Sequence, residues 1–491
     1  MEKTDHRPPA DHRPVAMMTG SNITSWRLEN HLPNDCVIDK RHITPKVEMN
    51  YARFLNATSL ARKPSPIRVL TELLSRSPPS MISLAGGMPN PELFPFQEAD
   101  IKLRDGSTLK IDSSTMKTAL QYGPTQGNAE LITWMKKLQS HLHNPPTLND
   151  DQDADSKMNI CVTVGSQDGI CKVFEMLVNP GDNVLLDNPT YAGTLAILRP
   201  LGVNLLGVNT DQYGMQPKSL RKILSRWSPD EKFDKNSDIP KIIYTIPNGV
   251  NPTGASLTTE RKQEIYQIAQ DYGLLVLEDD PYYFLQFSKT KSPSFLSMDV
   301  DGRVLRFDSF SKILSSGLRL GMVSGPSVLT NKLSLHMMAS VLHCSSFSQI
   351  MVLELLKRWQ IEGFLQHTEK VTAFYKEQKD CLIAAANKHL KGLAEWHEPV
   401  AGMFLWLKLL GIKDTKTLIE EKALAKEVML VPGFAFQTDE SVPCNYVRAA
   451  FSLATPEQMD TNGEKQHDFE RIFGLGSLNS PPATGFVPST D

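Results

Sequence analysis

The stretch Val304–Gly321, VLRFDSFSKILSSGLRLG, joins a short apolar strand to a polar turn. The turn carries Ser309, Ser311 and Lys312, and Arg319 follows seven residues after the lysine. A lysine enclosed beside a sheet has its pKa lowered by desolvation, so its amine can form an imine and act as a base. Two hydroxyls and a guanidinium suit a phosphate dianion. Taken alone, however, the segment is better explained as a surface loop with one paired arginine.

Short runs rich in β-branched residues alternate with helical segments between residue 110 and about residue 345. This alternation predicts βαβ units and an α/β fold with a largely parallel sheet. Farther on, the helical patterns Gln349–Trp359 and Phe364–Leu390 precede a strand-like Met403–Leu407, which predicts a second, α+β lobe. The runs expected as strands of the large sheet are Asn159–Val164, Asn183–Asp187, Lys241–Thr245, Leu274–Glu278 and Val304–Phe307.

Polar residues follow three more of these strands. Asn251 lies in the turn NPTG, and Asp279 and Tyr282 lie in EDDPYY at the carboxyl end of a strand, where open α/β sheets bind ligands. A carboxylate there can keep a pyridine nitrogen protonated, and a phenol can bind the phenolic oxygen of a pyridoxal ring. Ser166 and Gln167 begin a predicted helix, whose free amides suit a phosphate group. Each signal is weak alone, but together they outweigh the surface-loop interpretation.

Composition excludes several classes of function. The 52 Lys and Arg residues against 55 Asp and Glu residues leave a net charge of −3, so no basic field attracts a nucleic acid. No apolar run approaches the roughly 20 residues of a membrane helix. The six cysteines are scattered, without a C-x-x-C pair or clustered histidines, so neither a disulfide framework nor a metal site is expected.

The order of these motifs resembles the class I/II aminotransferases of fold type I, over roughly Met49 to Asp460. The resemblance implies a large domain whose mostly parallel, seven-stranded sheet lies between helices, and a smaller α+β domain. Within the family, the members that act on 2-aminoadipate and kynurenine are the most similar. The passages that carry the resemblance are Ser80–Pro91 (SMISLAGGMPNP), Val304–Gly321, Gly392–Trp406 (GLAEWHEPVAGMFLW) and Tyr446–Asp460.

The resemblance also implies roles for the residues around the cofactor, pyridoxal 5'-phosphate. Lys312 would hold it as a Schiff base and later move a proton between the substrate α-carbon and the cofactor. Asp279 would pair with the pyridinium nitrogen, Asn251 and Tyr282 would bind the phenolate oxygen, and Tyr191 would stack on the ring.

The phosphate and the substrate would have their own sets of residues. The phosphate would be held by Ser166, Gln167, Ser309, Ser311 and Arg319, joined by Tyr122 of the partner subunit in a homodimer. Arg448 would bind the substrate α-carboxylate through both guanidinium nitrogens. The remaining substrate contacts implied are Arg68, Gly87 and Asn251.

The reaction expected is amino transfer by a ping-pong mechanism, from 2-aminoadipate or kynurenine to 2-oxoglutarate. One alternative is another pyridoxal-phosphate reaction at the α-carbon, such as β-elimination or decarboxylation, although the combination of Arg448 and Asp279 favours transamination. The other is a non-catalytic protein. A pseudoenzyme should lack Lys312, and a cofactor-sensing regulator should carry a DNA-binding module, for which residues 1–48 are too irregular.

Five segments are expected: a disordered extension 1–48, an N-terminal arm 49–78, a large cofactor-binding domain 79–345, a small domain 346–460 and a divergent, disordered tail 461–491. The family ends with an amphipathic helix where this tail is rich in Gly, Pro and Ser, so reduced stability is hypothesised. MNYARFLNATSLARK, from Met49, has the composition of a mitochondrial transit peptide but also suits a simple arm. A mitochondrial location is expected if Met49 is the N-terminus, and a cytoplasmic one otherwise.

Overall fold

The computed structural model describes residues 48–461, except 76, 79, 83, 85, 86, 150, 151 and 235, and it leaves the side chains of 68, 71, 72, 74, 75, 426 and 461 undescribed. The extension before residue 48 and the tail after residue 461 therefore lie outside the described residues. The five-segment division and the reduced stability assigned to the tail stay predictions. Within the described residues no helix has the length and apolarity to cross a membrane.

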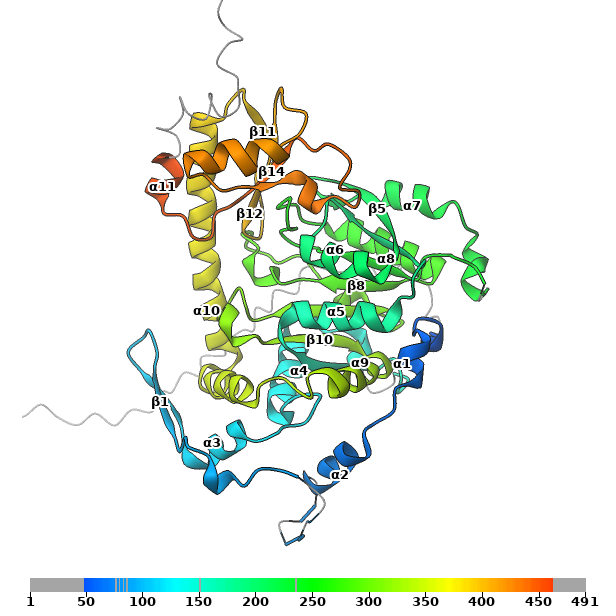
Figure 1. Cartoon of the computed structure of the whole chain (residues 1–491), viewed down its shortest axis with the longest axis vertical. Coiled ribbons are helices and arrows are strands. Elements are labelled where there is room, and N and C mark those ends of the chain that lie inside the picture. The colour runs from blue at the N-terminus through cyan, green and yellow to red at the C-terminus, as the bar shows by residue number, and fades with distance from the viewer. Residues whose placement is uncertain are drawn as a thin grey trace, which may run out of the picture. The chain divides into compact units, whose positions relative to one another are not determined.

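The main sheet has eight strands with helices packed on it (Figure 1). β10 is antiparallel to both of its neighbours, and the two-residue β6 is antiparallel to β5, whereas the other six strands run in one direction. β6 adds an eighth strand to the seven expected. In spatial order the strands are β3 (Met158–Thr163), β10 (Gly321–Pro326), β9 (Val304–Ser309), β8 (Leu275–Asp279), β7 (Ile242–Thr245), β4 (Asn183–Asn188), β5 (Asn204–Asp211) and β6 (Gly214–Met215).

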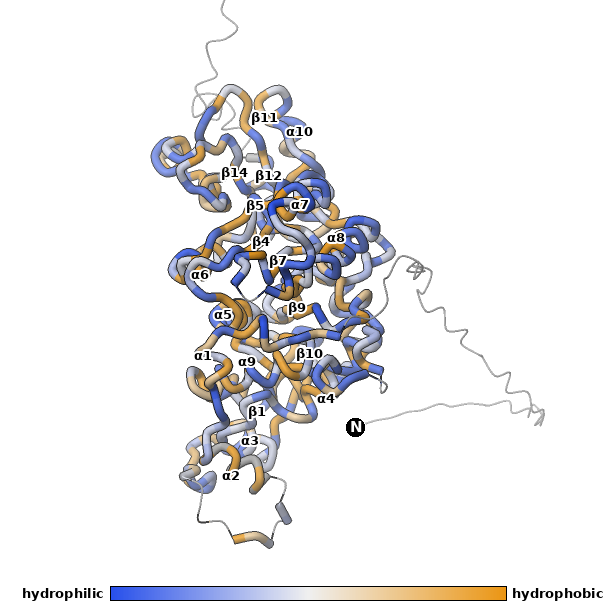
Figure 2. The backbone as a smooth tube through the Cα atoms, turned by 90° about the vertical axis from the view of Figure 1, so that its right-hand side faces the viewer, coloured by the Kyte–Doolittle hydropathy of each residue, from blue (hydrophilic) through white to orange (hydrophobic). Residues whose placement is uncertain are grey.

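The α/β fold expected from the sequence is confirmed, and each strand singled out for the large sheet begins within one residue of its expected start. The β-branched runs are buried along their length, as strands covered on both faces must be. Figure 2 shows the resulting hydrophobic residues along β9 and β10.

Helices cover the sheet. α5 packs on β3, β9 and β10, α8 packs on β8, and α7 packs on β5. The described helices before the long α10 are α1 (Ala57–Ala61), α2 (Pro66–Ser75), α3 (Ser113–Leu120), α4 (Ala129–His143), α5 (Gly165–Leu177), α6 (Ala192–Leu198), α7 (Pro217–Leu224), α8 (Thr259–Tyr272) and α9 (Ser327–Ser340). A separate hairpin, β1 (Ala99–Lys102) with β2 (Thr108–Ile111), precedes α3.

The helix α10 (Ser346–His389) leads from the main core to a second one. Its backbone is non-helical at Gln360 (φ 54°, ψ −171°), the point that separates the two helical patterns expected from the sequence. Beyond it lies an antiparallel sheet with its own apolar core, followed by α11 (Pro456–Thr461). Its strands in spatial order are β11 (Ala394–Trp396), β12 (Phe404–Leu409), β14 (Tyr446–Ala450) and β13 (Val431–Pro432).

The stretch that begins at Met49 is built into the folded body. Tyr51 and Phe54 are buried in the main core, and the Tyr51 hydroxyl donates a hydrogen bond to the Gly302 carbonyl (2.8 Å). Asn56 caps α1, and its amide also donates to the Val178 carbonyl (3.0 Å). Of the two interpretations of this stretch, these contacts favour a structural arm over a removable leader.

Candidate active site

The residues expected to bind the cofactor gather at one edge of the main sheet. The six strands that run in one direction place their carboxyl ends there, which is where open α/β sheets bind ligands. Each of these strand ends except that of β5 contributes to the site. Ser166 and Gln167 follow β3, Tyr191 follows β4, Asn251 follows β7, Asp279 and Tyr282 lie at and after the end of β8, and Ser309, Ser311 and Lys312 lie at and after the end of β9.

Asp279 is a buried carboxyl with one oxygen held and one oxygen open. The Tyr244 hydroxyl donates to Oδ2 (2.6 Å), whereas Oδ1 has no hydrogen-bond partner among the described residues. Burial raises the pKa of Asp279 to about 7, and Asp280 adds to this effect while the Tyr244 hydrogen bond opposes it. A cationic N–H placed at Oδ1 would stabilise the ionised carboxylate.

A cradle for an anion forms where α5 begins. Gly165 has φ +75°, and a Cβ atom there would lie 2.5 Å from Nη2 of Arg319. This arginine donates to the Val164 carbonyl (3.3 Å) and to Oγ of Ser311 (3.4 Å). The backbone N–H of Ser311 in turn donates to Oγ of Ser309 (3.2 Å). The guanidinium, both hydroxyls and the start of α5 thus meet at one point, as a phosphate site requires.

Lys312 is half-buried between two arginines. Burial lowers its pKa, and the positive charges of Arg319 and Arg448 lower the pKa further. A lysine amine under these conditions is more readily deprotonated and therefore a better nucleophile and base. The two guanidiniums that influence it belong to opposite sides of the site, one at the anion cradle and one on β14.

Arg448 lies on β14 and crosses to the turn after β7. Its Nη1 donates to Oδ1 of Asn251 (2.8 Å), and its guanidinium lies over the rings of Phe404 (4.5 Å) and Phe436 (5.1 Å). Burial lowers its pKa, and in the described chain its buried Nε has no hydrogen-bond partner. A carboxylate is the natural partner for an arginine that keeps a free donor in an apolar setting.

Two tyrosines are influenced by the charges of Asp279 and Arg448. Burial raises the pKa of Tyr191, the Asp279 charge raises it further, and Arg448 and Arg319 oppose this. The pKa of Tyr282 is likewise raised by burial and by Asp279. The ring of Tyr191 packs over Gly193, where a Cβ atom would come within 2.5 Å of it. The charges of Asp279 and Arg448 thus act on both tyrosines.

Four features of the site suit pyridoxal phosphate. Oδ1 of Asp279 is open to a ring N–H, the cradle at Gly165 suits the phosphate, Lys312 supplies the amine, and Tyr191 offers a ring face. Gln167 is tied to the same wall, since its side-chain amide donates to the Gly193 carbonyl (3.3 Å). The backbone of Ser166 closes on Gly321, where a Cβ atom would lie 2.7 Å from the Ser166 nitrogen.

Three of the predicted residues are not joined to the other residues of the site by these contacts. Tyr122 is half exposed, and its ring meets the ring of His343 edge-on at a centroid distance of 6.0 Å. Gly87 lies in an exposed loop, and an added Cβ atom would have no neighbour within 4 Å. The backbone of Arg68 lies in α2, but its side chain lies outside the described residues.

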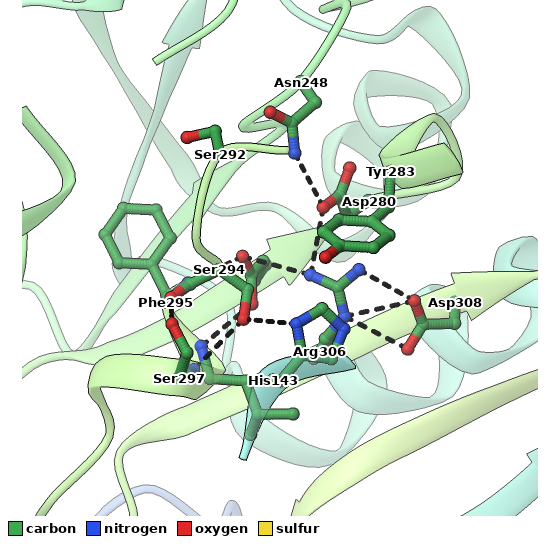
Figure 3. A network of polar contacts seen from close by, with 12 residues as sticks. His143, Asn248, Asp280, Tyr283, Ser292, Ser294, Phe295, Ser297, Arg306 and Asp308 are labelled. Carbon is green, nitrogen blue, oxygen red and sulfur yellow. Dashed lines mark hydrogen bonds and ion pairs between the residues drawn. The ribbon is translucent and has the colours of Figure 1, made fainter. Parts of the chain in front are cut away.

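Two features behind the site were not found from the sequence. One is Tyr244, the partner of Asp279. The other is a buried ion cluster around Arg306, whose Nη1 lies 3.0 Å from Asp280 and 3.2 Å from Glu278 and whose Nη2 lies 2.9 Å from Asp308 (Figure 3). The Asn248 amide donates to Asp280 (2.9 Å), which ties the turn before Asn251 to the end of β8. The signal available was a charged pair, Arg306 and Asp308, inside an apolar strand.

Comparisons with known proteins agree with this geometry. Residues 94–462 match the family described as aminotransferase class I and II. The kynurenine/alpha-aminoadipate aminotransferase, mitochondrial, of Bos taurus is 55% identical over 412 residues, which cover 84% of this chain and 97% of the relative.

Solved structures are also similar. Aminotransferase Aro8 from Candida albicans superposes with a TM-score of 0.75 at 28% identity, covering 88% of this chain and 100% of that one. The alpha-aminoadipate aminotransferase LysN from Thermus thermophilus, complexed with N-(5'-phosphopyridoxyl)-L-leucine, superposes with a TM-score of 0.64 at 26% identity, covering 86% of this chain and 98% of that one.

Proposed function

We propose, because the chain belongs to the class I and II aminotransferases, that it transfers the amino group of 2-aminoadipate, kynurenine or both to 2-oxoglutarate. It is a pyridoxal-phosphate-dependent enzyme that acts on amino acids and 2-oxo acids. The choice of donors is supported by the name of the cattle relative at 55% identity and by that of the bacterial LysN.

The observation that carries the proposal is the position of Lys312 between two arginines that suit different anions. Arg319 closes the cradle that suits the phosphate, and Arg448 keeps an unpartnered Nε donor that suits a carboxylate. The positive charges of both arginines lower the pKa of Lys312. An amino acid bound by its carboxylate at Arg448 would therefore present its α-carbon near the lysine.

Each side chain then has a separate task. When bound, pyridoxal phosphate withdraws electrons from the substrate α-carbon. Lys312 would hold the cofactor through its amine and would act as the base that moves the substrate α-proton. Asp279 would keep the ring nitrogen protonated, and Asn251 and Tyr282 would hold the phenolic oxygen. Tyr191 supports the ring face.

Other side chains would bind the phosphate and the substrate. The phosphate would be held by Ser166, Gln167, Ser309, Ser311 and Arg319. Arg448 would orient the substrate through its carboxylate. Arg68 and Gly87 belong to the segment that would contact the substrate side chain.

We also propose that the enzyme works as a homodimer. Large apolar side chains are exposed along the segment 67–96, including Leu70, Leu73, Ile82 and Leu84. Contiguous exposed apolar residues mark interaction surfaces, and Tyr122 stands half exposed nearby in sequence. A second copy that covers this segment would bring Tyr122 of the partner subunit to the phosphate.

A mitochondrial location is proposed as well, since the cattle relative is named mitochondrial. The stretch from Met49 is not expected to be the removable signal, because Tyr51 and Phe54 are core residues. Fractionation of cells that express the chain with a carboxyl-terminal tag tests the location. A tag found in the cytosolic fraction would contradict it.

The function is tested with purified protein, pyridoxal phosphate and each donor in turn. We expect a visible absorption band from bound cofactor that is lost when 2-aminoadipate or kynurenine is added and returns with 2-oxoglutarate. Lys312→Ala should slow this conversion by about a hundredfold to ten-thousandfold, since it removes the base. Lys291→Ala is the control, because burial also lowers the pKa of Lys291, to about 8, although it binds the carbonyls of Phe284 and Gln286 instead.

A normal conversion in Lys312→Ala would contradict the assignment of the lysine. A band that no amino acid changes would contradict amino transfer itself. Conversion by other amino acids alone would contradict the proposed donors and leave the family chemistry intact.

A further inference from the structure

We propose that Tyr244 is a positioning residue for the cofactor: its hydroxyl holds Oδ2 of Asp279 so that Oδ1 alone faces a protonated ring nitrogen. The inference rests on the proposed function, because it deepens the role given there to Asp279. It adds a residue that does not touch the cofactor and acts only through the carboxylate.

The sheet itself brings the two residues together. Tyr244 lies on β7 and Asp279 ends the neighbouring parallel strand β8, with Tyr244 opposite Leu277 in the register. The tyrosine side chain is fully buried and the aspartate nearly so. Their oxygens are 2.6 Å apart, a short hydrogen bond of the kind formed with an ionised acceptor.

The tyrosine must be the donor in this pair. Burial raises its pKa well above the usual value, and the nearby Asp279 charge raises it further, so the phenol keeps its proton. A donor at Oδ2 stabilises the ionised carboxylate against the burial that would neutralise it. The ring is packed against Phe174, at a centroid distance of 5.8 Å, which limits where the hydroxyl can point.

A second buried pair in the same domain shows how a purely structural carboxylate differs. The Tyr266 hydroxyl donates to Oδ1 of Asp299 (3.1 Å). There, the same oxygen accepts the backbone N–H of Arg303 (2.9 Å), and Oδ2 accepts the backbone N–H of Val304 (3.2 Å). Both oxygens of Asp299 are thus satisfied by the protein. In the described chain Asp279 leaves Oδ1 without a donor, at the edge where the cofactor binds.

The test compares two cofactors on the intact apoprotein. Pyridoxal phosphate is titrated by protein fluorescence, and so is its 1-deaza analogue, in which a C–H group replaces the ring nitrogen. The measured quantity is the Kd for pyridoxal phosphate divided by the Kd for the analogue. This ratio isolates the contact between the ring nitrogen and Oδ1. Tyr244→Phe deletes one oxygen atom and keeps the ring, and Tyr266→Phe is the matched control.

We expect Tyr244→Phe to weaken binding of pyridoxal phosphate about tenfold, the size expected for a hydrogen bond to a charged group, and to leave the analogue unchanged. Tyr266→Phe should lower the melting temperature without changing the ratio. Phe174→Leu keeps the hydroxyl but loosens the ring, so it should raise the ratio by less than Tyr244→Phe does. It also covers the case in which Tyr244→Phe does not fold.

Equal weakening of both cofactors in Tyr244→Phe would overturn the proposal, because it would show a packing effect. So would an unchanged ratio in Tyr244→Phe, or an unchanged ratio in Phe174→Leu where only that variant folds. Failure of the proposed function has a different signature, since wild type itself would then not bind pyridoxal phosphate.

Discussion

Two buried carboxyls at the carboxyl edge of the main sheet show how burial raises the pKa of a single acidic residue. Asp279 and Asp187 each have a pKa raised to about 7 by burial, and each leaves Oδ1 without a hydrogen-bond partner in the described chain. In the proposed site, the open oxygen of Asp279 would pair with the ring nitrogen of the cofactor. Among the described residues, Asp187 accepts the backbone N–H of Ile246 at Oδ2 (3.2 Å), and this hydrogen bond opposes the shift in part.

Asp187 should therefore make the protein less stable as the pH rises. Its folded pKa of about 7 exceeds the unfolded value of about 3.9, so between these values the folded state binds more protons than the unfolded state. Stability from this group is full below about pH 4 and falls as the pH rises to about 7. Asp187→Asn keeps an acceptor for Ile246, so it should raise the free energy of unfolding at pH 8 by up to about 4 kcal/mol.

Urea unfolding of the apoprotein between pH 5 and pH 8 measures this effect. The gain from Asp187→Asn should shrink as the pH falls, whereas the exposed Asp230→Asn should show no such trend. A variant that is less stable than wild type at pH 8 would show that the carboxylate has a stabilising partner.

Residues of the candidate site could be singled out from the sequence where a motif or a strand end marked them. Lys312 and Arg319 stand in a recognisable turn, and Asp279 ends a buried strand. Tyr244 was not predictable, since its role depends on which strand lies beside β8 and on the direction of its side chain. The same holds for Arg306, whose three acidic partners come from two different strands and the loop after β8.

At the scale of elements, the start of α5 depends on a glycine. Gly165 has φ +75°, which L side chains rarely adopt, and it leaves the room that Arg319 fills. Only Val164 separates the end of β3 from the start of the helix. The chain must therefore turn sharply and leave space for the guanidinium at the same residue. With glycine at position 165, the N-terminus of α5 can lie closer to the guanidinium of Arg319 than it could with any other residue there.

Gly165→Ala should weaken cofactor binding out of proportion to its effect on stability. The added Cβ atom would lie 2.5 Å from Nη2 of Arg319 and push the guanidinium from the cradle. Gly181→Ala is the control, because Gly181 has φ +87° but no atom within 4 Å of an added Cβ. Both variants should lose about 1 kcal/mol from backbone strain, measured by urea unfolding of the apoprotein.

Only Gly165→Ala should also raise the Kd for pyridoxal phosphate, by at least about tenfold if one charged contact is lost. Equal Kd values in the two variants would mean that the cradle does not hold the phosphate.

Strands with continuous β-branched runs were predictable, and strands without them were not. β7 reads IIYT and is buried throughout, so its pattern is unambiguous. β10 reads GMVSGP, which begins with glycine and ends with proline, and these residues suggest turns rather than a central strand. It forms because β3 and β9 both pair with it, a long-range condition that a local pattern does not contain.

For the whole molecule, the described chain leaves one extended apolar segment uncovered. Two helical residues of it, Leu70 and Leu73, are 48% and 62% exposed and lie on one side of α2 at i, i+3 spacing. Water contact with so much apolar surface is unfavourable, and because each leucine is already partly covered, burial in a dimer would stabilise it by about 1–2 kcal/mol. The boundaries expected for arm and domains stay predictions, because the main core takes side chains from Tyr51 through Phe404.

Leu70→Glu combined with Leu73→Glu should therefore dissociate the enzyme. Sedimentation of wild type should give twice the chain mass of 54.8 kDa, and the double variant should sediment as a monomer at micromolar concentration. Phe233→Glu is the control: this side chain is also largely exposed, at 77%, but lies far along the chain from the arm. If Tyr122 of the partner subunit holds the phosphate, the dissociated variant should bind pyridoxal phosphate more weakly, and Tyr122→Phe should do so without dissociation. A monomeric wild type that binds the cofactor at full strength would contradict both parts.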